Sequence, residues 1–90
     1  NKTFRWAAPE LLEEPPVITS AADVWSFGML CYEVATGKIP FHAFSNDAKV
    51  IGEIQAGRTP SVAEAGELGR IMTLCCVLDP KKRPSMLQLV

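Results

Sequence analysis

Apolar residues along this chain gather in separate groups, and their spacing within each group is typical of helices. The longest group covers residues 21–35 and is followed by Gly37, a residue that commonly ends helices. Ser20 stands where an N-cap belongs, and Asp23 places a carboxylate in the first turn. The pattern therefore predicts a central helix of about four turns.

Apolar side chains do not keep to one side of this central segment. They point nearly all round the expected helix: Val24, Trp25, Phe27, Met29, Leu30 and Val34. Such a helix needs neighbours on every side, and the chain offers only short amphipathic segments to enclose it. We therefore expect some neighbours of the central helix to lie outside these 90 residues.

Shorter helices are expected on both sides of the central one. Residues 9–14 form a short segment that two consecutive prolines end. Residues 47–55 form another, in which Ser45 is the expected cap and Gly57 the expected stop.

A third helical group lies nearer the C-terminus and is broken by Asp79 and Pro80. Its apolar residues recur at spacings of three and four: Leu68, Ile71, Met72, Cys75 and Leu78. Ser61 and Glu64 have the spacing of a capping box before it, and a last helix starts within residues 83–90. No strand alternation of useful length and no internal repeat occurs. The expected fold class is all-α.

Composition narrows the classes of function. The formal net charge is −1, from nine Lys plus Arg against ten Asp plus Glu, which argues against a nucleic-acid-binding protein. A hydrophobic share of 48% is too high for a disordered chain. The longest apolar segment is shorter than the about 20 residues of a membrane span, and no secretory signal is expected. Because the chain begins at Asn1 rather than Met, we expect it to be a piece of a longer protein.

The cysteines point to a reducing environment. Cys31, Cys75 and Cys76 are an odd number, which indicates no disulfide framework and favours a cytoplasmic (intracellular) location. Zinc binding by these thiols and His42 would need a Cys-x-x-Cys type of spacing that is absent, so no metal site is expected. Buried thiols acting as small apolar groups are the simpler interpretation. Serine hydrolysis is also set aside, because the chain has no Gly-x-Ser-x-Gly.

Four short motifs resemble segments of the protein kinase family and follow one another in the family's order. Residues 3–10, Thr-Phe-Arg-Trp-Ala-Ala-Pro-Glu, look like the end of an activation segment with its Ala-Pro-Glu motif. Residues 23–28, Asp-Val-Trp-Ser-Phe-Gly, resemble the start of the central helix of the large lobe. Residues 36–41 and 79–85 are similar to the following turn and to the stretch that opens the last conserved helix. The resemblance implies that residues 1–90 are a partial kinase domain, the distal helical portion of the C-terminal lobe.

The catalytic parts of a kinase have no counterpart in this sequence. The family uses a glycine-rich loop, a strand lysine, a catalytic-loop Asp and Asn, and a metal-binding Asp. No two glycines here are two apart, and Asp23, Asp47 and Asp79 all lack a catalytic or metal-binding context. His42 is the sole histidine, and it is not followed by Arg-Asp. The resemblance therefore implies ATP and Mg²⁺ for the intact parent, no bound cofactor for this chain, and no catalytic residue within it.

The resemblance assigns structural roles to five residues. It implies a buried ion pair between Glu10 and Arg83, and a central-helix position for Trp25. Asp23 resembles the aspartate that accepts hydrogen bonds from the catalytic-loop backbone, although locally it only places a carboxylate at a helix N-terminus. Glycine in a helix interior destabilises the helix, so close packing of another segment against the central helix is the expected reason for Gly28.

Three residues of the first motif are assigned to substrate binding by the resemblance: Thr3, Arg5 and Trp6. Thr3 lies where serine/threonine kinases commonly carry threonine and tyrosine kinases carry proline. Arg5 and Trp6 stand where a tyrosine is commoner, and this pair is similar to the one found in the tyrosine-kinase-like group. Without the resemblance, Trp6 is equally a core or interface aromatic.

One position departs from the family's pattern. Cys76 stands where kinases of this type usually have tryptophan. Because a large aromatic side chain is missing there, we expect altered packing around the Glu10–Arg83 pair.

Two functions of different class remain open. The first is the distal part of a protein kinase that transfers the γ-phosphate of ATP to serine or threonine hydroxyls, less readily tyrosine, of a protein substrate. The second is a non-catalytic helical interaction module derived from a kinase or pseudokinase. A His-Arg-Asp and an Asp-Phe-Gly shortly upstream of Asn1 would favour the first.

Overall fold

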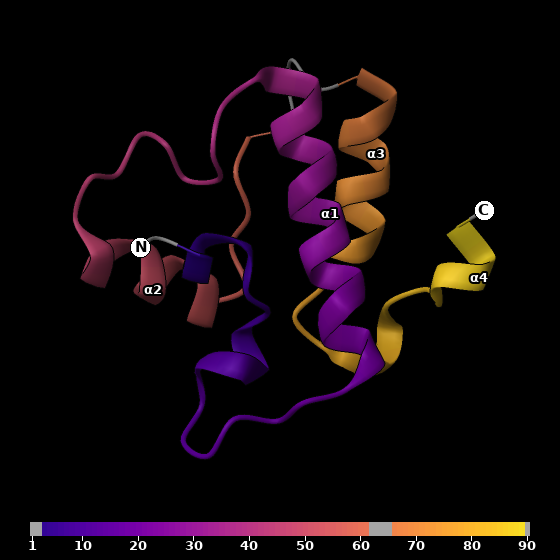
Figure 1. The fold of residues 1–90 in the computed structure, drawn as a ribbon, viewed down its shortest axis with the longest axis horizontal. Coiled ribbons are helices and arrows are strands. Elements are labelled where there is room, and N and C mark those ends of the chain that lie inside the picture. The colour runs from indigo at the N-terminus through magenta and orange to yellow at the C-terminus, as the bar shows by residue number, and fades with distance from the viewer. Residues whose placement is uncertain (1–2, 62–65, 90) are drawn as a thin grey trace.

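The computed structural model describes residues 3–61 and 66–89, and all regular structure within these ranges is helical. The all-helical fold class is therefore confirmed for this part of the chain. The elements follow one another as η1 (Thr3–Trp6), η2 (Pro9–Leu12), α1 (Ser20–Thr36), α2 (Asp47–Gln55), α3 (Gly66–Cys75), η3 (Pro80–Lys82) and α4 (Met86–Leu89), where η marks a short 3₁₀ helix (Figure 1). Within the described ranges, no helix combines the length and the apolar character that crossing a membrane requires.

Helix α1 is the central element, and the sequence predicted its end correctly. Gly37 adopts a left-handed conformation (φ 71°), and its N–H donates to the Glu33 carbonyl at 2.8 Å. The predicted start was wrong by one residue, because Thr19, with extended backbone angles, is the N-cap and Ser20 already lies in the first turn. The Thr19 side chain makes no capping hydrogen bond, so this helix start depends on its tertiary contacts.

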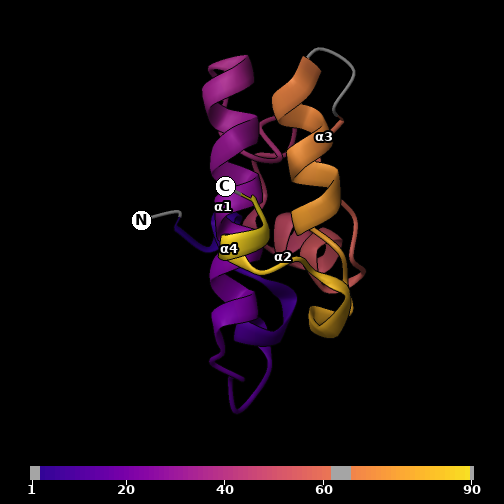
Figure 2. The same cartoon turned by 90° about the vertical axis from the view of Figure 1, so that its right-hand side faces the viewer.

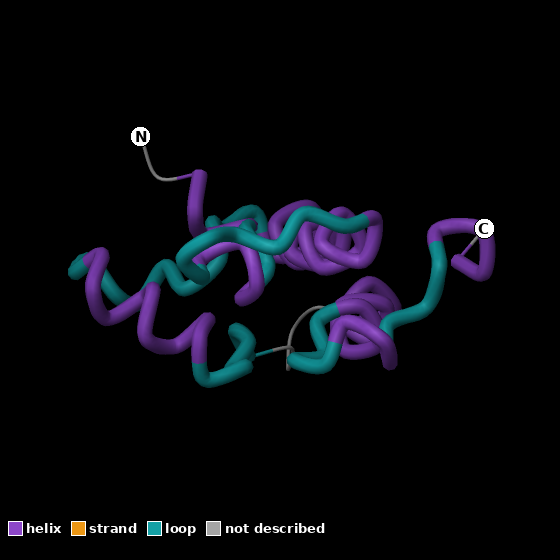
Figure 3. The backbone as a smooth tube through the Cα atoms, turned by 90° about the horizontal axis from the view of Figure 1, so that it is seen from below, coloured by secondary structure: helices purple, strands orange, loops and turns teal. Residues whose placement is uncertain are grey.

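Helices α1 and α3 lie side by side and run in opposite directions (Figures 1 and 2). Gly28 of α1 lies in close contact with the C-terminal end of α3. A Cβ added there would lie 2.7 Å from the Cys76 Sγ and 2.8 Å from the Cys75 Cβ. The expectation that Gly28 permits close helix packing agrees with this geometry, and Figure 3 shows the two helices end-on as adjacent coils.

Helix α2 covers the residues that the sequence predicted, but its cap is a different residue. The Asn46 side chain, and not that of Ser45, accepts the Lys49 N–H at 3.2 Å. Asn46 has the extended backbone angles of an N-cap, and its amide oxygen reaches the third residue of the helix. Two apolar residues of α2, Val50 and Ile54, are fully buried in the core.

Two helices are shorter in the structure than the sequence predicted: the one nearer the C-terminus and the one over residues 9–14. Helix α3 ends at Cys75, so Leu78 lies beyond it and is half exposed. Glu64, half of the predicted capping box, lies outside the described residues. The segment predicted over residues 9–14 forms only the short 3₁₀ helix η2, which ends before the two prolines.

One stripe of α1 is left uncovered by this chain. Asp23, Leu30 and Val34 are exposed and Phe27 is half-buried, at spacings of three and four that place all four on one face. Leu30 is 49% exposed and Val34 69%, whereas Trp25 is fully buried on another face. The described chain therefore encloses the central helix on some sides only, as its all-round apolar pattern predicted.

Candidate functional site

A buried ion pair joins the two ends of the described chain. Arg83 Nη1 donates to Glu10 Oε2 at 2.7 Å, and Arg83 Nη2 donates to Glu10 Oε1 at 2.9 Å. The Arg83 side chain is fully buried and that of Glu10 is 8% exposed. Two parallel hydrogen bonds fix orientation as well as charge, so this contact sets how η2 lies relative to the segment after η3.

The remaining donors of Arg83 bind backbone carbonyls of other elements. Its Nε donates to the Val77 carbonyl at 2.8 Å, Nη1 to that of Ala21 at 2.9 Å and Nη2 to that of Leu78 at 3.3 Å. The guanidinium also lies over the Trp25 ring, 5.2 Å from its centroid. One side chain thus connects η2, the start of α1 and the segment that follows α3.

Electrostatics keep the Glu10 carboxyl ionised inside this contact. Burial by itself would raise the pKa of Glu10, but the hydrogen bond and positive charge of Arg83, with a backbone hydrogen bond, hold it below its ordinary value. Cys76, the departure from the family's pattern, is buried nearby, and its Sγ donates to the Trp25 carbonyl at 3.4 Å. The smaller side chain at position 76 therefore does not prevent the ion pair.

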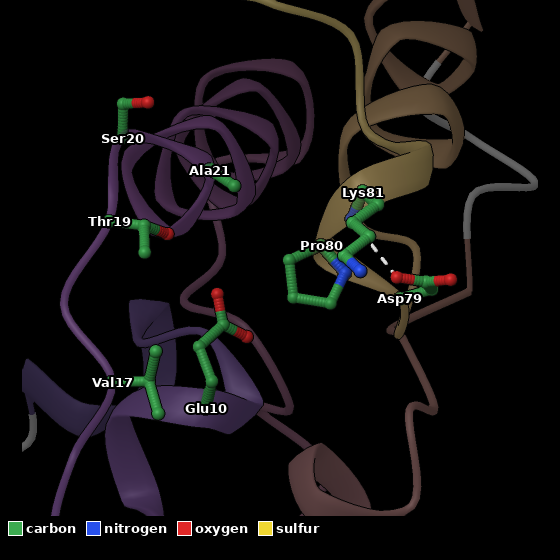
Figure 4. Close-up of a pocket in the computed structure, with 8 residues that line it drawn as sticks. All are labelled: Glu10, Val17, Thr19, Ser20, Ala21, Asp79, Pro80 and Lys81. Atoms are coloured by element: carbon green, nitrogen blue, oxygen red, sulfur yellow. Dashed lines mark hydrogen bonds between the residues drawn. The ribbon is translucent and has the colours of Figure 1, made fainter.

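A cavity of about 390 Å³ lies beside the ion pair, between the start of α1 and η3 (Figure 4). Val17 and Pro80 form apolar walls, and Glu10 lies between them in the view of Figure 4. Asp79 caps η3 by accepting the Lys81 N–H at 3.0 Å. The cavity is mainly apolar and open to the surface, and Glu10 is the member of the ion pair that lines it.

Arg5 is buried in the structure, and its assignment to substrate binding stays a prediction. The sequence assigned it to substrate binding, whereas the structure buries it to 3% exposure. Its Nη1 donates to the carbonyls of Pro40 and Phe41 at 3.0 and 2.8 Å, and its Nη2 to that of Phe44 at 2.9 Å. The guanidinium therefore anchors η1 to the loop after α1 and is not directed to solvent, because carbonyls of that loop converge on it.

Trp6 is half-buried and bound to α1 at two places. Its indole Nε1 donates to Glu33 Oε1 at 3.1 Å, and its carbonyl accepts from Ser26 Oγ at 2.8 Å. Sequence reasoning missed Glu33 and Ser26 as partners. The only signal for Glu33 was that, besides Asp23, it is a carboxylate within the apolar group of residues 21–35. The side chain of Thr3 lies outside the described part of the structure.

The predicted structural residues of α1 occupy distinct environments. Asp23 is exposed in the first turn, at the end of the uncovered stripe. Trp25 is fully buried, and within the described residues its indole Nε1 has no hydrogen-bond partner. Its ring packs beneath the Arg83 guanidinium, so the predicted helix position of Trp25 is also a contact with the ion pair.

The described residues form no metal-binding site. Among residues 3–61 and 66–89, no group of three or more His, Cys, Asp or Glu side chains is arranged to hold one. Cys31, Cys75 and Cys76 are free and buried. Burial raises the pKa of all three thiols, that of Cys75 to about 11. These cysteines are therefore packed thiols and not thiolate ligands.

Comparison with known proteins gives one consistent result. Residues 1–90 match the family of protein tyrosine and serine/threonine kinases. The chain is 40% identical over 86 residues to the human "Inactive tyrosine-protein kinase 7", covering 91% of this chain and 8% of that protein. It is 29% identical to the serine/threonine-protein kinase STY17 of Arabidopsis thaliana, covering 98% of this chain and 16% of the relative. It is 33% identical to the dual specificity protein kinase pyk3 of Dictyostelium discoideum, covering 96% and 6%. The chain thus spans only a small part of the length of these relatives.

Proposed function

This chain belongs to the protein tyrosine and serine/threonine kinase family, and we propose that it forms the distal helical part of the C-terminal lobe of an enzyme that phosphorylates protein hydroxyls. The observation that carries the proposal is the buried pair of Glu10 and Arg83. It connects the Ala-Pro-Glu motif to the last motif across 73 positions. Two motifs that resemble kinase segments are thereby held together in one structure.

Within this proposal, the chain supplies scaffold and not chemistry. The described residues do not fit a Mg²⁺ site, and no step of phosphoryl transfer is assigned to them. ATP and Mg²⁺ would be bound by upstream parts of the parent, where the family carries its glycine-rich loop and catalytic aspartates. The turn over Thr3–Trp6 would lie next to those parts and face the protein substrate.

The uncovered stripe of α1 supports a parent with a larger lobe. Leu30 and Val34 are large apolar side chains on one face of a helix whose other faces are packed. Burying them would add to stability in proportion to the apolar area removed from water, about 25 cal/mol per Å². We propose that upstream polypeptide of the same protein covers this face and that Asp23, at its edge, binds backbone N–H groups there.

Serine or threonine is the proposed phosphate acceptor. The support is Thr3, which lies where serine/threonine kinases carry threonine, together with a relative of that class, STY17. Tyrosine is the alternative acceptor, because the matched family includes both classes. Phosphoamino-acid analysis of a protein phosphorylated by the parent distinguishes the two.

A second function follows from one comparison. A relative that is 40% identical is named an inactive kinase, so a non-catalytic helical module is the alternative. In that case, the same fold would serve as a binding surface and the parent would transfer no phosphate. The alternative differs from the main proposal only in the upstream catalytic residues.

The test uses the intact protein that contains this chain. Purified with Mg²⁺ and labelled ATP, it is expected to transfer phosphate to a general protein substrate. The control is the same protein and substrate with Mg²⁺ removed by a chelator, which should give no phosphate transfer. An intact protein that transfers no more phosphate than this control would refute the enzyme proposal and favour the interaction module.

An intracellular location is proposed as well. Its support is that all three cysteines are free and buried, as in a protein that folds without disulfides. A fluorescent fusion of the intact protein checks this. Accumulation in the culture medium would contradict it.

A further inference from the structure

We propose that a second cavity, between the end of α1, the loop after it and α2, binds a basic side chain of a protein partner, either arginine or lysine. In Figure 1 that loop leaves the end of α1 and runs to α2. The cavity measures about 280 Å³ and shares no lining residue with the cavity beside the ion pair. The residues that carry the inference are Tyr32, Phe41, His42, Phe44 and Glu53. We call this space the aromatic cavity.

Aromatic rings form much of its wall. Phe41 is buried and Phe44 is half-buried. The Tyr32 hydroxyl lies 3.4 Å from His42 Nδ1, and this hydrogen bond holds the loop against α1. The faces of aromatic rings carry negative potential and attract cations. The wall therefore suits a positively charged group better than an anion.

Glu53 supplies a carboxylate that its own neighbours hold only loosely. Its side chain is 17% exposed, yet Lys49 Nζ and Arg58 Nε lie 3.9 and 3.5 Å from its Oε2. Both contacts are longer than the about 2.7–2.9 Å of a charge-assisted hydrogen bond. The two cationic side chains are also more than half exposed, so solvent screens both pairs. Glu53 therefore keeps the capacity to bind a further cation closely.

Lys49 shows which chemistry this side of the aromatic cavity accepts. Its ammonium lies over the Phe44 ring, 5.5 Å from the centroid, and beside Glu53. An aromatic face and a carboxylate thus already hold one organic cation between them. Because Lys49 and Glu53 are an exposed pair four positions apart on one helix, their contact is weak. We expect a basic side chain of the partner to displace the Lys49 ammonium into solvent.

The rim of the aromatic cavity suits a side chain that stays attached to a polypeptide. His42, Ala43 and Thr59 line the cavity and are exposed. A peptide can therefore run across the rim while one of its side chains enters between the aromatic rings and Glu53. The inference goes beyond the proposed function, since binding here involves no transfer of phosphate.

The test measures ligand binding to the intact protein by saturation-transfer NMR, without ATP. The probes are the peptides Gly-Gly-Arg-Gly-Gly and Gly-Gly-Lys-Gly-Gly, and the control peptide carries citrulline, a neutral isostere of arginine. Both basic peptides should bind, and the citrulline peptide should bind at least about fivefold more weakly. Equal binding of the citrulline peptide would refute a cation site. Binding of free N-acetylarginine amide without binding of either basic peptide would refute a protein partner.

Two variants on the same helix place the binding at this cavity, because they act in opposite directions. Glu53→Gln keeps the shape of the side chain but removes its charge, so the arginine peptide should bind about fivefold more weakly. Lys49→Met removes the competing ammonium and should strengthen binding. A variant that fails to fold cannot produce this gain. Glu67→Gln, at an exposed carboxylate of α3, is the matched control and should bind like wild type.

Two results for these variants would overturn the inference. Unchanged binding in Glu53→Gln would place the peptide elsewhere on the protein. Weaker binding in Lys49→Met would show that Lys49 is not a competitor for the site. None of these measurements uses catalysis, so an intact protein that transfers no phosphate would refute the proposed function and leave this test unaffected.

Discussion

Arg83 and Glu10 face each other through two parallel hydrogen bonds of 2.7 and 2.9 Å, although 73 positions separate them in the sequence. The same guanidinium binds the carbonyl of Ala21 at the start of α1 and lies over the Trp25 ring. The pair therefore determines the relative placement of three segments that share no regular hydrogen-bonding pattern. Its energetic importance can be tested from either side.

Arg83→Leu is expected to destabilise the intact protein by about 3–5 kcal/mol, because it leaves the Glu10 carboxylate buried without its partner. The measurement is the urea midpoint of unfolding. Lys81→Leu, at an exposed position of the same basic run, is the control and should shift the midpoint little. An Arg83→Leu midpoint equal to that of wild type would show that the pair contributes nothing to stability.

Gly28→Ala is expected to lower stability by about 1–3 kcal/mol, the usual range for overpacking a filled core. The new Cβ would lie 2.7 Å from the Cys76 Sγ and 2.8 Å from the Cys75 Cβ, so α1 and α3 must separate. Gly52→Ala in α2 is the matched control. Its Cβ would meet nothing within 4 Å, and alanine should stabilise that helix by up to about 1 kcal/mol. Thermal melts of the two variants should therefore move in opposite directions, and a Gly28→Ala protein as stable as Gly52→Ala would contradict the close contact.

The stability of the protein should fall in acid through Glu10. Burial raises the pKa of this carboxyl, but its hydrogen bonds and the charge of Arg83 together lower the pKa by more than burial raises it. The folded pKa therefore lies below the ordinary value of 4.5. The unfolded chain therefore takes up the proton first as pH falls. The stabilisation is fully present above about pH 4.5 and is lost as pH falls through the folded pKa.

Urea midpoints measured from neutral pH down to pH 3 check this dependence. A Glu10→Gln variant cannot titrate at this position, so its acid loss of stability should be smaller than that of wild type. Parallel curves for the two proteins would mean that other carboxyls account for the acid sensitivity.

Asn46→Ala is expected to destabilise α2 by about 1 kcal/mol, because it removes the side-chain oxygen that accepts the Lys49 N–H. Ser45→Ala is the informative comparison, since Ser45 was the cap predicted from the sequence. It should cost much less, a few tenths of a kcal/mol at most, as expected for an exposed position outside the cap. Equal losses of helicity by circular dichroism in the two variants would argue against the observed cap.

Local patterns were sufficient for much of the helical framework. Residues 47–55 were predicted as a helix and form α2, and Gly37 ends α1 as expected. These features depend on spacing and on the backbone freedom of glycine, which act over a few neighbouring residues. The errors also lie at helix ends, where Ser20 and Ser45 were each one residue away from the observed caps.

The contacts of the candidate site could not be predicted from local sequence patterns. Glu10 and Arg83 were paired only through the resemblance to kinases, because no local pattern relates residues 73 positions apart. Arg5 was assigned to substrate on the same resemblance, yet the structure surrounds its guanidinium with carbonyls of the loop after α1.

The sequence by itself determined where helices form, that the central one is apolar all round, and which family the motifs resemble. Only the tertiary structure decided which groups meet: Trp6 with Glu33, Arg5 with the loop carbonyls, and Gly28 with Cys75 and Cys76 at the end of α3 and just after it. The physical reason is that helix formation follows from local hydrogen bonds and periodicity. The direction of a long polar side chain depends on the donors and acceptors that distant segments bring to it.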